Sequence, residues 1–299
     1  RQGFAVLYPE QQRSNNANLC FNWFEQGDIK RDRGEAASIS QMIHHLIETQ
    51  GVDARRIYIT GLSAGGAMAN AMLATYPDLF AGGAIIGGLP FGVASTVGEA
   101  FERMQGRNPP DAAKLQATLK GASGNKGARP AISVWHGTHD QTVRPANAEH
   151  IVMQWSGVHA VSGAPSHTIE TGKITRRVWL SEDGDEVIEV NLVRGMGHGV
   201  PLATKSETAL GAPAPYMLET GISSTMRIAR SWGLATDTDV AKAEVVEKYD
   251  GEVIDNTVTS LLERTLRRSR GQANAGGAAD EGRVAKVIND ALRAAGLMR

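Results

Sequence analysis

The amino-acid sequence predicts an α/β fold: a mostly parallel sheet with helices on both faces, an antiparallel hairpin, and a helical C-terminal tail. Short apolar runs rich in β-branched residues alternate with segments of helical periodicity, as in a parallel sheet that is covered on both faces. Later runs are separated by T-G and E-D-G-D turns, which predict the hairpin. The character of the chain changes near Leu234, so we expect one domain over residues 1–234 and a tail over residues 235–299.

Local patterns place the individual elements along the chain. The expected strands and apolar runs are, in order, Phe4–Tyr8, Ile57–Thr60, Phe80–Ile86, Ala131–Trp135, Thr168–Glu170, Ile174–Leu180 and Glu186–Val193. The expected helices are Gly34–Gln50, Ala64–Tyr76, Asp111–Leu119, Ala146–Trp155 and Ser223–Trp232. In the tail, a Gly/Ala-rich linker over Gly271–Gly282 separates two amphipathic helix candidates, Asp255–Arg270 and Arg283–Met298.

Composition argues against several classes of protein. The formal net charge is -1 over 299 residues, which gives no indication of a nucleic-acid surface. No apolar run approaches the roughly 18 residues that would indicate a membrane span. Cys20 is the single cysteine, so no disulfide can form within this sequence.

The segment from Arg56 to Gly66, R-I-Y-I-T-G-L-S-A-G-G, carries the clearest functional pattern. It combines an apolar strand, a glycine-bounded turn with Ser63, and the start of a small-residue helix, which is the context of a G-x-S-x-G nucleophile elbow. Glycines such as Gly61 leave room for the strained turn. Chance occurrence in a chain with 34 glycines is the alternative, but it does not explain the flanking strand and helix. We therefore expect Ser63 to attack an acyl carbon and the Ala64 amide to supply half of an oxyanion hole.

A serine nucleophile needs a histidine base and a carboxylate that orients it. In elbow-containing folds these groups follow the serine, the acid first and the histidine second. Asp140 fits the acid because it follows the strand Ala131–Trp135, and catalytic groups gather at the carboxyl ends of such strands. A turn or helix-capping role is the alternative for Asp140. His198 fits the base because it lies in G-M-G-H-G after the last hairpin strand, where a core role has little support.

Other titratable residues fit these roles less well. Asp183 and Asp185 are explained by the E-D-G-D turn. His136 and His139 form an H-x-x-H-D string with Asp140, but no second cluster at ligand spacing accompanies it. We therefore expect no metal site and interpret His136 as a structural residue at the strand end.

Two further segments are more specific than the elbow: C-F-N-W-F-E-Q-G-D over Cys20–Asp28 and R-G-E-A-A-S-I over Arg33–Ile39. They are followed in order by G-L-S-A-G-G-A-M, S-V-W-H-G-T-H-D, G-M-G-H-G and G-I-S-S-T. Together these motifs resemble the poly(3-hydroxybutyrate) depolymerase family of esterases, which is related to the feruloyl and acetylxylan esterases. The resemblance covers roughly the region from Arg1 to Leu234, and the tail shows none.

The resemblance implies an α/β-hydrolase fold that uses neither a metal nor an organic cofactor. It implies hydrolysis of carboxylic esters through an acyl-enzyme and supports the roles of Ser63, Asp140 and His198. Because many members of this family are secreted, it also suggests extracellular action on a polymeric or oligomeric ester.

The chain departs from the family at its start, R-Q-G-F-A-V-L-Y-P. Members of the family begin with a strand that ends in an H-G-C segment, upstream of anything present here. The resemblance implies that this segment supplies the second oxyanion-hole amide and the disulfide partner of Cys20, so we expect both before Arg1 in a longer polypeptide. Loss of one oxyanion donor costs about two to three orders of magnitude in turnover. Full esterase turnover by this segment alone would contradict the expectation.

Three hypotheses of function follow. The leading one is a serine esterase for polyhydroxybutyrate or its oligomers, with a feruloyl or acetylxylan esterase as the alternative. The second is a serine peptidase of the same fold, and the third is a non-catalytic, hydrolase-like binding module. Trp23 and Trp135 are candidate substrate contacts, and a core role is the alternative for both. Oligomeric state and the role of the tail are left open.

Overall fold

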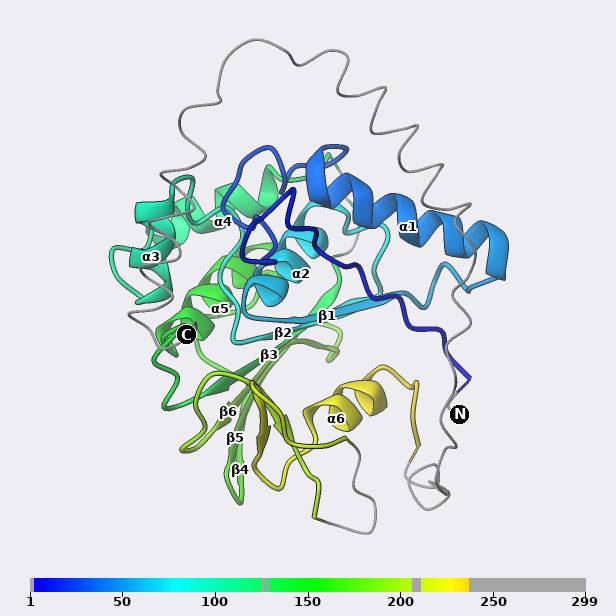
Figure 1. The fold of residues 1–299 in the computed structure, drawn as a ribbon. Coiled ribbons are helices and arrows are strands. Elements are labelled where there is room, and N and C mark those ends of the chain that lie inside the picture. The colour runs from blue at the N-terminus through cyan, green and yellow to red at the C-terminus, as the bar shows by residue number, and fades with distance from the viewer. Residues whose placement is uncertain (1–2, 125–126, 128, 206–210, 237–299) are drawn as a thin grey trace, which may run out of the picture. The chain divides into compact units, whose positions relative to one another are not determined.

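The computed structural model describes residues 3–124, 127, 129–205 and 211–236, and all statements below concern these residues (Figure 1). The tail helices expected over Asp255–Arg270 and Arg283–Met298 lie outside this range. Their existence and the domain boundary near Leu234 therefore stay predictions.

A six-stranded sheet in the order β1-β2-β3-β6-β5-β4 forms the centre of the described chain. Its parallel part consists of β1 (Tyr58–Leu62), β2 (Gly82–Ile86), β3 (Ala131–Gly137) and β6 (Glu186–Val193). The antiparallel part adds β5 (Ile174–Leu180) and β4 (His167–Thr171) at one edge. The predicted mostly parallel sheet with an antiparallel hairpin is confirmed.

The strand register brings the functional loops to one edge of the sheet. Leu62 pairs with Ile86, Ile86 pairs with Trp135, and Gly137 pairs with Val193. The carboxyl ends of the parallel strands therefore lie level with one another, and the loops that follow them meet there. This edge is where open α/β sheets place their ligand and catalytic groups.

Helices cover both faces of the sheet, as the sequence predicts (Figure 1). One face carries α1 (Gly34–Gln50), α2 (Ala64–Thr75), α4 (Ala112–Lys120) and α5 (Ala146–His159), which share a core cluster with residues such as Ile85 and Val134. On the other face, α6 (Ser224–Ser231) packs through Ile228 into a cluster with Ile86, Trp135 and Val193. The alternation of Ile85 and Ile86 between the two clusters follows the two-residue period of a strand.

Two kinds of short element were not predicted. Helix α3 (Val97–Met104) is capped by Thr96, whose side chain accepts a hydrogen bond from the Glu99 amide. The Gly and Pro residues around this segment made it look like a loop in the sequence. Strands β7 (Val200–Leu202) and β8 (Met217–Glu219) form a separate parallel pair. Each is too short to show a strand periodicity.

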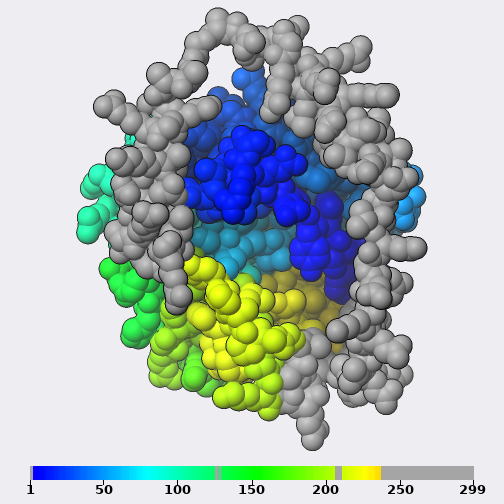
Figure 2. Space-filling view, in the orientation of Figure 1, coloured from blue at the N-terminus to red at the C-terminus, as the bar shows by residue number. Residues whose placement is uncertain are grey.

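The predicted buried strand over Phe4–Tyr8 is wrong. The segment has no regular structure, and Phe4, Val6 and Tyr8 are 43%, 56% and 84% exposed. A strand forms only where its backbone pairs with a neighbouring strand, and no described strand pairs with the outer edge of β1. Only Leu7 on this segment packs against the core. Figure 2 shows this dark blue N-terminal part of the chain at the surface of the molecule.

None of the described helices combines the length and the hydropathy that crossing a lipid bilayer requires.

The loop between the N-terminal segment and α1 is held by a buried carboxylate, Glu35. Its Oε2 accepts the amide of Asn22 at 2.8 Å, and its Oε1 accepts the side-chain amides of Gln11 at 2.5 Å and Asn15 at 2.7 Å. Asp28 adds a second carboxylate, which accepts from the Glu35 amide and the Asn22 side chain. This network joins the R-G-E segment, which carries Glu35, to the C-F-N segment, which carries Asn22.

We expect the Glu35 network to lose stability as pH rises. Burial raises the pKa of Glu35 from 4.5 to about 7, although hydrogen bonds from Asn22 and Gln11 act in the opposite direction. Between these values the folded protein holds a proton that the unfolded chain has released, so the free energy of unfolding falls with rising pH. Each pKa unit corresponds to about 1.4 kcal/mol, so the full effect is about 3 kcal/mol. Urea unfolding at a series of pH values measures it.

The variant Glu35→Gln should remove this pH dependence, and Glu48→Gln, an exposed glutamate on the same helix, is the matched control. As pH falls from 7.5 to 4.5, the wild type should gain unfolding free energy relative to Glu35→Gln. A difference that stays flat over this interval would contradict the prediction.

Candidate active site

Ser63 lies in a sharp turn between β1 and α2. Its backbone has φ 58° and ψ -121°, in the positive-φ region that non-glycine residues rarely adopt. Its amide donates to the carbonyl of Ile86 at the end of β2, at 2.9 Å. A Cβ at Gly61 would lie 2.2 Å from the carbonyl oxygen of Gly65, so only glycine permits so tight a turn. The local geometry is that of the expected elbow.

Ala64 is the first residue of α2. Amides in the first turn of a helix have no intrahelical acceptor, and the helix dipole favours negative charge beside them. The Ala64 amide therefore lies at a position that favours negative charge. Its predicted role stays a prediction.

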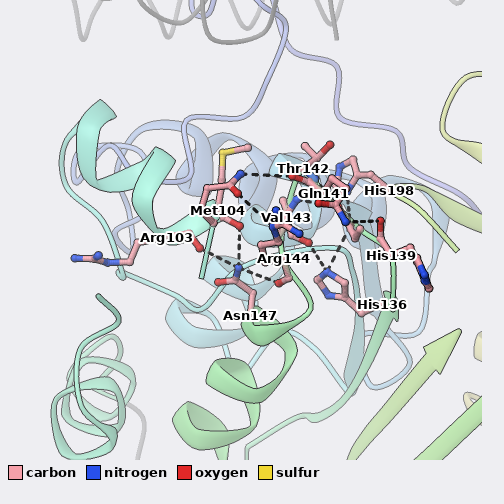
Figure 3. A network of polar contacts seen from close by, with 12 residues as sticks. Arg103, Met104, His136, His139, Gln141, Thr142, Val143, Arg144, Asn147 and His198 are labelled. Atoms are coloured by element: carbon pink, nitrogen blue, oxygen red, sulfur yellow. Dashed lines mark hydrogen bonds and ion pairs between the residues drawn. The ribbon is translucent and has the colours of Figure 1, made fainter. Parts of the chain in front are cut away.

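Asp140 follows β3, and Figure 3 shows its neighbours Thr142, Val143 and His198 close together. The side chain is 1% exposed, and its Oδ1 accepts the amides of Thr142 and Val143, both at 2.9 Å. The other carboxylate oxygen, Oδ2, lies 2.6 Å from Nδ1 of His198. Burial raises the pKa of Asp140, but hydrogen bonds from His136 and His198 outweigh it and hold this pKa well below its usual range. The carboxyl group is therefore ionised at neutral pH.

The loops after β3 and β6 are joined by backbone contacts. The amide of Thr138 donates to Val193 at 3.0 Å, and the amide of His139 donates to Met196 at 2.9 Å. The amide of Gly195 in turn donates to the Thr138 hydroxyl at 2.9 Å. These bonds bring residues 58 positions apart, Asp140 and His198, into hydrogen-bonding distance.

Gly87 brings the His198 ring close to the elbow. Gly87 follows Ile86, the residue that holds the Ser63 amide, and a Cβ at Gly87 would lie 3.3 Å from Cε1 and Nδ1 of His198. The imidazole therefore packs against the backbone next to the serine turn. A hydrogen bond between Ser63 and His198 is not among those of the described residues, and such contacts often tighten only when substrate binds. The three sequence-predicted residues thus lie at one edge of the sheet.

His136 has a part in the site that sequence reasoning missed. It is fully buried at the end of β3, with Nε2 2.7 Å from the Val143 carbonyl and 3.5 Å from Asp140 Oδ2. Its Nδ1 has no hydrogen-bond partner in the described part of the chain. The only sequence signal was its position four residues before Asp140. His136 is thus a structural residue that holds the Asp140 carboxylate and the following loop in place.

The loop of Asp140 is also anchored to α3. The buried side chain of Asn147 donates to the carbonyl oxygens of Arg103 at 2.9 Å, Arg144 at 3.2 Å and Met104 at 3.3 Å (Figure 3). The Arg144 amide adds a bond to Met104 at 2.8 Å. Helix α3, which the sequence did not reveal, thereby fixes the far side of the loop that carries the carboxylate.

The remaining predicted residues lie in different environments. Trp23 is buried in a cluster with Leu89 and Val143, against which Ala64 also packs, so it lies near the site and its role stays a prediction. Trp135 is buried in the core, where its indole N–H donates to Ser133 at 3.0 Å, and it offers no face to a substrate. Cys20 is an exposed free thiol in this structure. No group of His, Cys, Asp and Glu that could hold a metal ion occurs within the described ranges.

The variant Gly87→Ala should disable His198. The new methyl group would lie 3.3 Å from the His198 ring. The alanine would also have to adopt a backbone φ of 51°, which side-chain-bearing residues rarely do. We expect kcat/KM for an ester substrate to fall about tenfold, because the ring must shift by a few tenths of an ångström and a misplacement of about 1 Å costs about a hundredfold.

Gly51→Ala is the matched control for this variant. Gly51 has φ 65° at the C-terminus of α1, and a Cβ there meets nothing within 4 Å. Both variants should lose about 1 kcal/mol of stability from backbone strain, but only Gly87→Ala should lose activity. Equal activities for the two variants would show that contact with His198 at Gly87 is unimportant.

Comparisons with known proteins identify the family of the chain. The model of the family "Esterase PHB depolymerase" matches residues 1–171. Poly(3-hydroxyalkanoate) depolymerase C of Paucimonas lemoignei is 40% identical over 233 residues, which are 77% of this chain and 56% of that protein. An acetylxylan esterase of Coprinopsis cinerea is 28% identical over 214 residues, 67% of this chain and 54% of that protein.

Among solved structures, an acetyl xylan esterase from Aspergillus awamori superposes with a TM-score of 0.59 at 22% identity, over 73% of this chain and 74% of its own. That likeness establishes the α/β-hydrolase fold. The chain spans about half the length of the curated relatives it matches. With the family model covering more than half of the sequence, the resemblance carried by the C-F-N-W-F segment is confirmed, and the chain belongs to the esterase PHB depolymerase family.

Proposed function

We propose that this protein is a serine esterase that cleaves carboxylic esters through an acyl-enzyme, with Ser63 as nucleophile, His198 as base and Asp140 as its orienting acid. The observation that carries the proposal is the 2.6 Å contact between His198 Nδ1 and the buried Asp140, beside a serine in a strained turn. Strained residues and perturbed carboxyl groups gather at active sites. Membership of an esterase family supports the same conclusion.

The geometry supports the following sequence of steps for the proposed reaction. The ionised Asp140 accepts a hydrogen bond from Nδ1–H of His198. This leaves Nε2 of the neutral ring free to take the proton of the Ser63 hydroxyl as Oγ attacks the ester carbonyl. The oxyanion that forms is stabilised by the Ala64 amide. His198 then gives its proton to the departing alcohol, and a water molecule activated by the same histidine releases the acid.

For the substrate, we propose a polyester of hydroxyalkanoic acids, such as polyhydroxybutyrate, or its oligomers. The relative with 40% identity is called a poly(3-hydroxyalkanoate) depolymerase, which favours this substrate over acetylated or feruloylated plant-wall esters. Those esters are the second candidates, because acetylxylan and feruloyl esterases also match over much of the chain. Extracellular action is part of this proposal, since a polymer supplied from outside must be cleaved before its units can cross a membrane.

A fluorophosphonate probe and a substrate panel test the proposal together. The probe should form an adduct that peptide mass spectrometry assigns to Ser63, because an activated serine is a strong nucleophile. The protein should hydrolyse p-nitrophenyl butyrate and hydroxybutyrate oligomers, but not the matching p-nitroanilide. Turnover of the anilide alone would favour a serine peptidase, and absence of an adduct on Ser63 in the full-length protein would favour a binding module. Release of acetate or ferulate in preference to hydroxybutyrate would move the substrate class to the plant-wall esters.

A further inference from the structure

Tyr216 lies against the histidine of the proposed site, although nothing in the sequence pointed to it. Its ring centroid is 6.1 Å from that of His198, with an angle of 77° between the planes, so the two rings meet edge to face. The side chain is 39% exposed. The residue precedes β8, and its carbonyl accepts the amide of Val200 at 2.7 Å, which fixes its backbone beside the loop that carries His198.

The backbone at Tyr216 is unfavourable for a large side chain. Its φ is 64°, in the left-handed region that favours Gly and Asn, and a bulky residue there is a rare exception. The turn itself is closed by backbone bonds between Ala214 and Met217, in which no tyrosine side chain takes part. The local structure would therefore be more stable with glycine or asparagine. The tyrosine is retained at a cost in backbone energy, which is typical of functional positions.

Catalysis decides which half of an ester Tyr216 would meet. The acyl carbonyl must point toward the N-terminus of α2, where the oxyanion is stabilised. The alcohol oxygen must lie beside His198, because that ring gives it the proton as the bond breaks. A side chain packed on His198 and open to solvent therefore faces the alcohol half. Figure 2 shows the yellow-green segment around β7 and β8 on one side of recessed cyan atoms, with the dark blue N-terminal segment on the other.

We propose that Tyr216 is a specificity-determining residue that contacts the alcohol half of the ester substrate, while the acyl half is recognised elsewhere. This inference rests on the proposed esterase function. An aromatic face beside the departing oxygen suits an alcohol with an extended or flat apolar body, such as the next unit of a polyester chain or an aromatic alcohol.

Two ester series separate contact with the alcohol half of the substrate from a general effect of Tyr216 on His198. The alcohol series is methyl and benzyl butyrate, and the acyl series is p-nitrophenyl acetate and hexanoate. The variants are Tyr216→Phe, which keeps the ring, and Tyr216→Asn, which removes it while suiting the left-handed backbone. Tyr216→Gly is a second ring-free variant that relieves the strain, and thermal unfolding checks the fold of each.

In both ring-free variants we expect the benzyl-to-methyl ratio of kcat/KM to fall about three- to tenfold, the effect of losing an aromatic contact. The hexanoate-to-acetate ratio should stay within about twofold, and Tyr216→Phe should keep both ratios. The melting temperature should be unchanged or higher in Tyr216→Gly.

A uniform loss on all esters would show that Tyr216 only positions His198 and would overturn the proposal. A change confined to the acyl ratio, or no change at all, would overturn it as well. Absence of both ester turnover and a fluorophosphonate adduct on Ser63 in the wild-type protein would instead refute the proposed esterase function, so the two failures are distinguishable.

Discussion

Replacing Ser63 by alanine is expected to lower kcat for p-nitrophenyl butyrate by about 10⁶-fold, the size of effect that removal of a triad serine has in serine hydrolases. The hydroxyl is the only group in the proposed mechanism that forms a covalent bond with substrate, so no neighbour replaces it. The backbone should be unaffected, because alanine meets the same strain at φ 58° as serine. Steady-state kinetics and the fluorophosphonate adduct measure the loss.

Ser38→Ala provides the matched control. Ser38 lies on α1, where its hydroxyl donates to the Gly34 carbonyl at 3.1 Å, and it has no place in the proposed chemistry. It should retain both turnover and the adduct. Activity in Ser63→Ala within tenfold of the wild type would refute the assignment of the nucleophile.

Replacing Asp140 by asparagine is expected to lower kcat about 10⁴-fold while leaving the fold intact. The Thr142 and Val143 amides both donate to Oδ1, so they fix the asparagine with its carbonyl oxygen on that side. Its NH₂ group must then stand in the place of Oδ2, which faces His198. A donor at that position forces the Nδ1 proton of His198 onto Nε2, where the ring can no longer accept the serine proton.

Kinetics of Asp140→Asn beside Asp183→Asn tests this argument. Asp183 lies in an exposed turn between β5 and β6 and was the weaker candidate for the acid from sequence. It should keep full activity. A loss in Asp183→Asn comparable with that in Asp140→Asn, or a loss below tenfold in Asp140→Asn, would show that the acid lies elsewhere.

The fold was predictable wherever local chemistry is decisive. β-Branched runs such as Ile57–Thr60 and Ile174–Leu180 form strands because their side chains fit a pleated surface, and the structure has strands β1 and β5 there. Helices α1 and α2 follow the periodicity of their apolar residues and the stop at Pro77. The prediction failed at Phe4–Tyr8 because a strand needs a partner, and pairing is decided by the rest of the chain.

The candidate site divides in the same way. The sequence indicated Ser63, Asp140 and His198 as candidates because each follows a strand, and the carboxyl ends of parallel strands meet at one edge of a sheet. The partners that hold them were not visible. Val143 and His136 contact Asp140 only because the loop after β3 turns back on the end of that strand. Tyr216 lies beside His198 because the two short strands β7 and β8 pair.

The sequence by itself indicated the six strands of the main sheet in chain order, the described helices other than α3, the residue at the elbow, and the family to which the chain belongs. These features depend on spacing and on residue type. The tertiary structure alone decided that Trp135 is buried, that Glu35 holds the N-terminal loop, and that Gly87 and Tyr216 enclose the His198 ring. Such contacts join residues far apart in the chain, and their geometry is fixed only when the sheet brings its strand ends together.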